Sequence, residues 1–247
     1  MGVNPGPRDL VAMLRGRRVL FVAPHSDDVA YSCGGLLARC SRGAELHLAT
    51  VFDRSAYAND EALRALGSAA VTETRAKEDQ GYADRRGMHR RHLGLPDSSL
   101  SGYSDLAEMG PDPELDARHG DACAALERLV RDVAPDVIVG PAGLGGHVDH
   151  GMVHAGLRAL GGRVAQLFYE DIPYAAAFDL AVVDGRLGGA GLVPLATVSI
   201  RETLEEKIRD MWSYRSQTDQ KGIDAMISHA RRLGRDGEAC ERMWTLE

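Results

Sequence analysis

Residues 18–36, RVLFVAPHSDDVAYSCGGL, lead from an apolar segment directly into a cluster of polar side chains. After its first residue the run 18–23 is wholly apolar, which is typical of a strand buried on both faces of a parallel sheet. His25, Asp27 and Asp28 follow at once. Open α/β sheets bind their ligands outside the carboxyl ends of their strands, so these side chains stand where a site belongs. The stretch therefore predicts a fold class and the position of a site together.

Further apolar runs alternate with helical patterns along the rest of the chain. We expect an α/β fold, a Rossmann-like three-layer sandwich with a mostly parallel sheet and the active site at the C-terminal ends of the strands, in a single domain over residues 1–247. The other expected strands are 45–52, 136–140, 164–170, LAVVD (180–184) and LATVSI (195–200), and the expected helices are 60–86, 114–134, 147–162 and the chain from Glu202 onward.

Two segments, 96–113 and 171–195, are rich in turn-forming residues. Long loops in compact domains are often functional. We expect the choice of substrate to reside there.

Composition excludes several classes of protein. The chain has 247 residues, 44% of them hydrophobic, and a formal net charge of −7, which argues against a general nucleic-acid binder. No run approaches the ~20 apolar residues of a membrane span, and the N-terminal residues show no signal-peptide pattern. Four cysteines without CxxC spacing favour free thiols. We therefore expect a cytoplasmic protein with no nucleic-acid or membrane partner, for which a homo-oligomer remains open.

A second polar cluster follows the predicted strand at 136–140. Here His147, Asp149, His150 and His154 stand within eight positions. Two strand ends of one sheet can converge, and histidine nitrogens with a carboxylate are the ligand set of a catalytic zinc site.

Other interpretations stay open for each cluster taken alone. Asp27 and Asp28 could be an acidic helix cap. His150 and His154, four residues apart on a predicted helix, could be the ligand pair instead.

The two clusters together resemble the LmbE-like, or PIG-L, family of zinc-dependent N-acetylglucosaminyl deacetylases and related amidases. The family's first motif, [AP]HPDDE with a Gly-Gly shortly after, is matched by PHSDD and GG, and its second, HxDH, by HVDH. Ser26 stands where the family has Pro, and Val29 where it has Glu, which puts some orientation of the ligands in doubt. Other segments similar to the family are TRAKED (74–79), LGLPDS (93–98), FYEDIPY (168–174) and WSYRSQ (212–217).

The resemblance implies that His25, Asp28 and His150 hold Zn²⁺, with another divalent ion such as Fe²⁺ as the alternative, and that Asp27 is the general base. Physical reasoning agrees with a division of labour between the paired aspartates. Adjacent side chains at a strand end diverge, so one can ligate the metal while its neighbour faces the attacking water.

The resemblance also implies roles for residues around the metal. His147 would stabilise the oxyanion in protonated form, or protonate the leaving amine, and Asp149 would orient it. Arg75 and Asp97 match positions that contact the sugar, and Tyr169 matches the rim of the site more loosely.

The function predicted is a zinc-dependent hydrolase that removes an N-acyl group, most simply acetyl, from an amino sugar or glycosylated small molecule in specialised metabolism. An amidase that cleaves a thiol-glycoside conjugate is the alternative within the family. From other classes, a Rossmann-like nucleotide-binding protein lacks the GxGxxG run after the first strand, and a non-catalytic metal-binding partner would need neither Asp27 nor His147.

Overall fold

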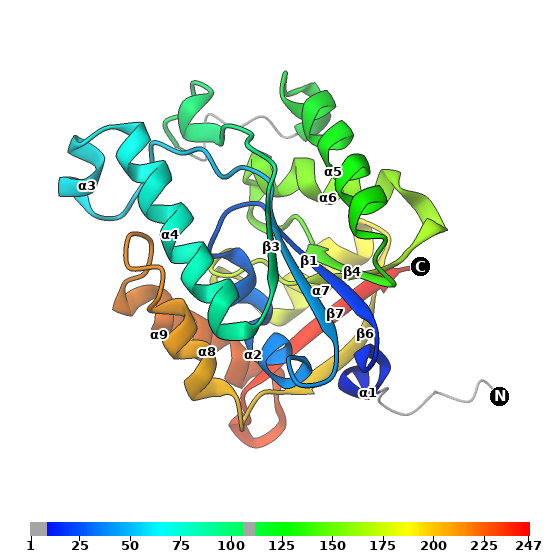
Figure 1. Cartoon of the computed structure of the whole chain (residues 1–247). Helices are drawn as coiled ribbons and strands as arrows, with labels where there is room; N and C mark the ends of the chain where they lie inside the picture. Colours follow the sequence, from blue (N-terminus) through cyan, green and yellow to red (C-terminus); the bar gives the residue numbers. More distant parts are fainter. Residues whose placement is uncertain (1–8, 106–111) are drawn as a thin grey trace.

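The computed structural model describes residues 9–105 and 112–247 (Figure 1). A seven-stranded sheet crosses the molecule in the order β3-β2-β1-β4-β5-β7-β6. In that order the strands are His89–His92, Glu45–Thr50, Arg18–Ala23, Val137–Pro141, Ala165–Tyr169, Cys240–Leu246 and Leu192–Ser199.

The first five strands of this order are parallel. In β1, Val19 is the register partner of Leu46 in β2 on one side and of Val137 in β4 on the other. Only β7 runs antiparallel to its neighbours, β5 and β6. The expected mostly parallel sheet is confirmed.

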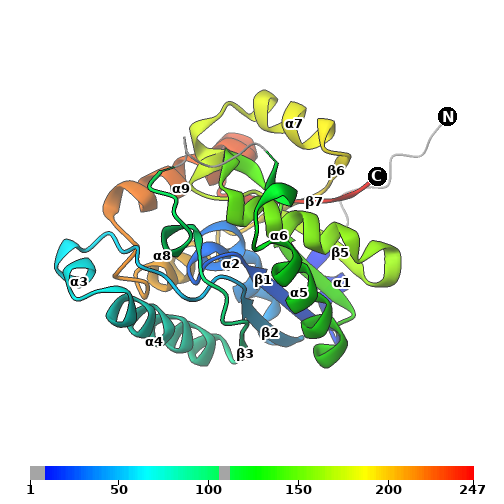
Figure 2. The same cartoon turned by 90° about the horizontal axis from the view of Figure 1, so that it is seen from above.

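Helices cover both faces of the sheet. α2 and α8 pack together with α4 beside them on one face, and α5 and α6 pack together on the other (Figures 1 and 2). The helices are α1 Leu10–Leu14, α2 Asp28–Cys40, α3 Glu61–Ala65, α4 Ser68–Arg86, α5 His119–Val133, α6 Val148–Ala159, α7 Leu180–Gly189, α8 Leu204–Met211 and α9 Gln220–Leu233. Among the residues described, none of these is both long and apolar enough to cross a bilayer.

The Gly-Gly pair in α2 allows a close approach between layers. A Cβ atom on Gly35 would lie 2.5 Å from Cγ2 of Ile200, which follows β6. The backbone N–H groups of Gly35 and Leu36 donate to the buried carboxylate of Glu241 in β7. Gly35 therefore allows α2 to pack closely against the end of β6 and against β7.

The sequence predictions fail at four segments. Residues 89–92 form the short edge strand β3, which pairs only with β2 and therefore shows no apolar run. LAVVD lies in helix α7, where only Val183 and Leu187, four residues apart, are buried. The chain ends in strand β7 rather than in helix, because buried ion pairs of Glu241 and Arg242 hide the strand pattern. Likewise 171–195 is no continuous loop, since it holds α7.

The other predicted loop, 96–113, is described only in part. Residues 98–100 form a 3₁₀ turn, and residues 106–111 lie outside the described part of the chain.

Candidate active site

The two polar clusters meet where the strand order reverses. β1 and β4 are adjacent and parallel, and their crossovers leave in opposite directions. Such a switch point opens a crevice at the carboxyl ends of the two strands. His25, Asp27 and Asp28 follow β1, and the second cluster follows β4 at the start of α6.

Three side chains converge there around one point. His25 Nδ1 lies 3.4 Å from Asp28 Oδ2, and His150 Nε2 lies 3.4 Å from Asp28 Oδ1. Their ligand atoms all lie within 4.8 Å of one another. These contacts are long for hydrogen bonds, but they match the separation of about 3.3 Å between two ligands of a tetrahedral zinc ion.

A carboxylate stands behind each histidine. His25 Nε2 lies 2.9 Å from Asp149 Oδ2, and His150 Nδ1 lies 2.6 Å from Asp171 Oδ1. Carboxylates that bind the second ring nitrogen of a metal-ligating histidine fix its tautomer and raise its basicity. Both rings are thus turned so that their other nitrogen faces Asp28.

The donor set fits a divalent metal. His150 Nε2 is buried and has no hydrogen-bond partner within the described structure, which is unusual for a polar atom in a protein interior. Burial lowers the pKa of His25, but bonds from Asp149 and Asp28 outweigh it and raise this pKa to about 10. The carboxylates around the two imidazoles therefore favour positive charge at this position, which a bound cation supplies.

Asp27 stands at the start of α2 but does not act as a helix cap. It occupies the N-cap position of α2, yet its side chain caps no backbone N–H. Its Oδ1 lies 3.6 Å from Arg75 Nη2. Burial and the neighbouring Asp28 raise the pKa of Asp27, which brings a carboxylate closer to the range useful for proton transfer.

His147 faces the two proposed histidine ligands. Its ring centroid lies 4.9 Å from that of His25 and 5.2 Å from that of His150. Burial and these two rings lower the pKa of His147 to about 3. The backbone N–H of Asp149 donates to Nδ1, so the neutral ring carries its hydrogen on Nε2.

A cavity of about 800 Å³ opens beside these residues. Its wall includes His25, Asp27, Asp28 and His147, and also Arg75 and Asp97, which approach each other to 3.9 Å. The remaining lining residues are Tyr31, Tyr57, Asn59, Ser98, Ser99, Tyr103, Ser104, Asp105, Ile172, Pro173, Tyr174, Gln217, Asp219, Lys221, Gly222 and Ala225.

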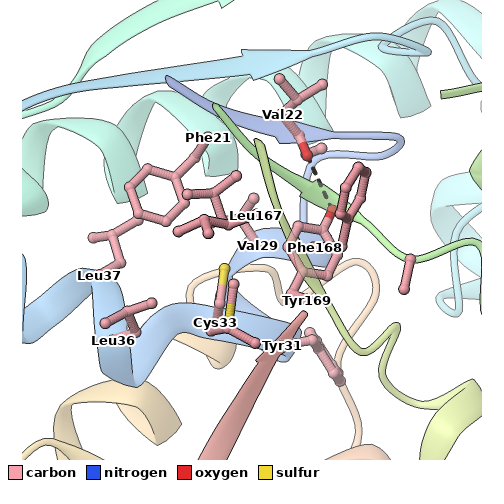
Figure 3. Close-up of a cluster of buried hydrophobic side chains, with 14 of the residues drawn as sticks. Phe21, Val22, Val29, Tyr31, Cys33, Leu36, Leu37, Leu167, Phe168 and Tyr169 are labelled. Atoms are coloured by element: carbon pink, nitrogen blue, oxygen red, sulfur yellow. Dashed lines mark hydrogen bonds between the residues drawn. The ribbon is translucent and has the colours of Figure 1, made fainter. Parts of the chain in front are cut away.

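The structure places Tyr169 and the Asp149 carboxylate differently from the sequence expectation, and it does not support the alternative ligand pair of His150 and His154. Tyr169 is fully buried outside the cavity wall, where its hydroxyl donates to Val22 O (Figure 3). The Asp149 carboxylate contacts His25 and not His147. Only the backbone N–H of Asp149 donates to His147. His154 joins none of the candidate metal groups among the described residues, and its Nδ1 lies 3.0 Å from Pro141 O.

Sequence reasoning missed Asp171 and Arg118. Asp171 belongs to FYEDIPY (168–174), one of the segments similar to the family, in which Tyr169 was the predicted site residue. Arg118 forms an ion pair at 2.8 Å with Asp149 Oδ1, although the N–H direction falls short of hydrogen-bond geometry. No spacing in the sequence links residues 118 and 149.

A family model described as PIG-L, GlcNAc-PI de-N-acetylase, matches residues 20–160, the segment that holds both clusters. The chain belongs to the PIG-L family. A 2'-N-acetylparomamine deacetylase from Streptomyces fradiae is 43% identical over 96% of this chain and 85% of its own. A 1D-myo-inositol 2-acetamido-2-deoxy-alpha-D-glucopyranoside deacetylase from Kineococcus radiotolerans is 28% identical over 87% of this chain and 61% of its own.

Solved structures of deacetylases share the fold. A deacetylase from the biosynthesis pathway of teicoplanin superposes with a TM-score of 0.74 at 23% identity, over 93% of this chain and 98% of that one.

Where the family motif has a glutamate, this chain buries Val29 in the apolar cluster below the site (Figure 3). The position has become part of the core, so it cannot orient the ligands here.

Proposed function

We propose that this PIG-L deacetylase is a zinc-dependent enzyme of antibiotic biosynthesis that removes the acetyl group from an N-acetylated amino sugar carrying further free amino groups. The observation that carries the proposal is the set His25, Asp28 and His150, in which Nε2 of His150 is buried and has no hydrogen-bond partner among the described residues, beside a cavity of about 800 Å³. The deacetylase of an acetylated aminosugar from Streptomyces fradiae, 43% identical along most of both chains, supports the choice of reaction.

Zinc held by His25, Asp28 and His150 would supply a Lewis acid that polarises the amide carbonyl. Asp27 takes a proton from the attacking water, since its carboxylate faces the cavity and is not used as a cap. The same carboxyl group then gives that proton to the leaving amine nitrogen. Water and amide are thereby converted into acetic acid and amine, which pass one proton between them and leave as acetate and ammonium at neutral pH, with no further co-reactant.

His147 supports this reaction as a neutral hydrogen-bond donor. Because its Nδ1 accepts from the backbone, Nε2–H is free to donate to the carbonyl oxygen as negative charge develops there. The protonated form expected from the sequence is not required. The guanidinium of Arg75 lies between the carboxylates of Asp27 and Asp97. It therefore keeps the carboxylate of Asp27 directed at the cavity.

The charge of the cavity suits a cationic substrate. Its lining includes five carboxylates, those of Asp27, Asp28, Asp97, Asp105 and Asp219, against two cationic side chains, Arg75 and Lys221. Even with a divalent zinc ion bound, one negative charge remains for ammonium groups of the substrate to meet.

The test is release of acetate, measured by mass spectrometry, from 2'-N-acetylparomamine and from N-acetylglucosamine, each with zinc present. We expect turnover of both, with a higher kcat/KM for the first, and a preference that weakens as salt screens the charges. If neither sugar releases acetate, the deacetylase proposal is rejected. Equal kcat/KM for cationic and neutral sugars would reject only the substrate preference.

A further inference from the structure

A second cluster of metal-ligating side chains lies at the amino ends of β2 and β3, the opposite end of the strands from the active site. We propose that Glu45, His47 and His89 form a second site for zinc or a similar divalent transition metal. The site is independent of the deacetylase centre and shares no residue with it.

Sheet register brings the three side chains together. His47 of β2 and His89 of β3 are register partners in a parallel pair, so their side chains leave the same face of the sheet. Their ring centroids lie 4.9 Å apart. Glu45 stands two residues before His47 and therefore on that same face.

The possible ligand atoms of this cluster lie as close together as those of the active-site group. One ligand atom from each of Glu45, His47 and His89 lies within 4.8 Å of the other two. His47 Nε2 lies 3.0 Å from Glu45 Oε1, so the imidazole and the carboxylate are already in contact, with Nδ1 and Oε2 left for an ion. Two imidazoles and one carboxylate with an open position suit zinc and its neighbours in the first transition series.

His47 gives an independent sign that something is missing from this cluster. Its side chain is buried, with only 6% of the residue exposed, and its Nδ1 has no hydrogen-bond partner among the described residues. A buried imidazole normally has partners for both nitrogens. A metal bound to one nitrogen would fix the ring and its tautomer, as second-ring partners do in the active site.

Arg18 is the neighbouring cation that a metal would have to tolerate. Its Nε lies 2.9 Å from Glu45 Oε1, the same oxygen that His47 approaches, so Glu45 Oε2 stays available to an ion. Bonds from His47 and Arg18 lower the pKa of Glu45, which keeps the carboxylate ionised.

Such a site would fasten the edge of the sheet. β3 has four residues and pairs with β2 alone. A metal bridging His47 and His89 adds a link across that single pairing, and an ion that binds only the folded chain raises stability by mass action.

The experiment counts zinc per chain in the intact protein by isothermal titration with elemental analysis, and follows thermal unfolding at rising zinc. We expect two zinc ions per chain in the wild type and in His92→Ala, and one in His89→Ala and Glu45→Gln. His92 is the matched control, because it belongs to the same exposed strand but lies against Asp53 instead. Deacetylation should be unchanged in His89→Ala at zinc levels that fill only the active site.

The zinc-induced rise in Tm should likewise be smaller in His89→Ala than in His92→Ala. One zinc ion in the wild type, or two in both His89→Ala and Glu45→Gln, would overturn the proposal. An equal loss of bound zinc in His89→Ala and His92→Ala would also overturn the proposal, because the ion would then be bound by surface histidines in general.

Discussion

Asp27 and Asp28 are neighbours in the chain with the same side chain, yet their surroundings shift their pKa values in opposite directions. Asp28 lies between His25 and His150, and although burial opposes it, the charges and hydrogen bonds of these histidines lower the pKa of Asp28 to about 2. For Asp27, burial and the neighbouring charge of Asp28 outweigh the charges of Arg75 and His25 and raise the pKa. A permanently ionised carboxylate is suited to hold a metal, and one with a raised pKa is suited to exchange a proton.

Asp27→Asn should therefore separate metal binding from catalysis. We expect the zinc content of the variant to equal that of the wild type while kcat falls by about 100-fold or more, because an amide cannot take the proton. Elemental analysis and acetate release measure the two properties on one preparation. Turnover close to the wild-type value would remove Asp27 from the role of base.

Asp171→Asn tests the carboxylate behind His150. Asp171 accepts from His150 with Oδ1 and from the Leu144 N–H with Oδ2, so the amide keeps the shape but loses the charge. We expect zinc affinity to fall by about 10- to 100-fold, as is typical for carboxylates that orient a metal-ligating histidine. Competition with a chelator measures it. Asp179→Asn, at an exposed position shortly after, should leave affinity unchanged, and equal affinities in both variants would refute the role.

Among secondary-structure elements, the start of α5 is tied to the site from outside the sheet. Arg118, the N-cap of α5, donates to Pro96 O and pairs with Asp116 and with Asp149 at the start of α6. Asp149 in turn binds His25. One guanidinium therefore connects the segment after β3, α5 and the first turn of α6 to a proposed metal ligand.

Arg118→Gln should weaken zinc affinity and kcat/KM together, each by about tenfold, because the buried Asp149 loses its cationic partner. A chelator titration and initial rates at saturating zinc measure the two quantities. The control is Arg131→Gln, an exposed arginine later in the same helix. If the two variants behave alike, α5 does not support the site.

Gly35 of α2, which approaches Ile200, and Gly185 of α7 form a matched pair of helical glycines. Gly35→Ala should lower the free energy of unfolding by about 1–3 kcal/mol, since its Cβ would meet Ile200 at 2.5 Å. Gly185 lies in α7 with open space around the position of a Cβ, so Gly185→Ala should raise stability by about 0.5–1 kcal/mol. Chemical denaturation gives both values. The same sign in both variants would contradict the packing argument.

At the scale of the whole molecule, Glu170 fastens the C-terminal elements to the sheet. It follows β5, and its carboxylate contacts His229 of α9 together with Arg242 and the Trp244 indole N–H of β7. Burial raises the pKa of Glu170, but these partners outweigh it and leave the pKa lowered. The stabilisation is present above the ordinary glutamate pKa of about 4.3 and is lost as pH falls through the lower folded value.

Glu170→Gln should reduce the free energy of unfolding at pH 7 by about 3–5 kcal/mol, because His229 and Arg242 lose a buried carboxylate. The difference from the wild type should shrink as the pH is lowered below the ordinary glutamate pKa, since the wild type then protonates the same group. Denaturant unfolding at neutral and acidic pH measures this. A difference that stays constant with pH would contradict the assignment.

The local pattern of the chain was enough to predict the parallel strands β1, β2, β4 and β5 and the two clusters that follow β1 and β4. Buried parallel strands are continuous apolar runs, and a site at their ends is made of residues that come next in the chain. Asp27, Asp28 and the histidines could therefore be found without knowing the neighbours of any strand.

Only the tertiary structure decided what stands behind those residues. Asp171 and Arg118 reach the site from elements that the sheet order and the packing of α5 on α6 bring close. The strands β3 and β7 likewise became visible only through their partners, because an edge strand and a strand with buried ion pairs lack the apolar pattern. Long-range contacts depend on which elements are neighbours in space, and no short stretch of sequence contains that information.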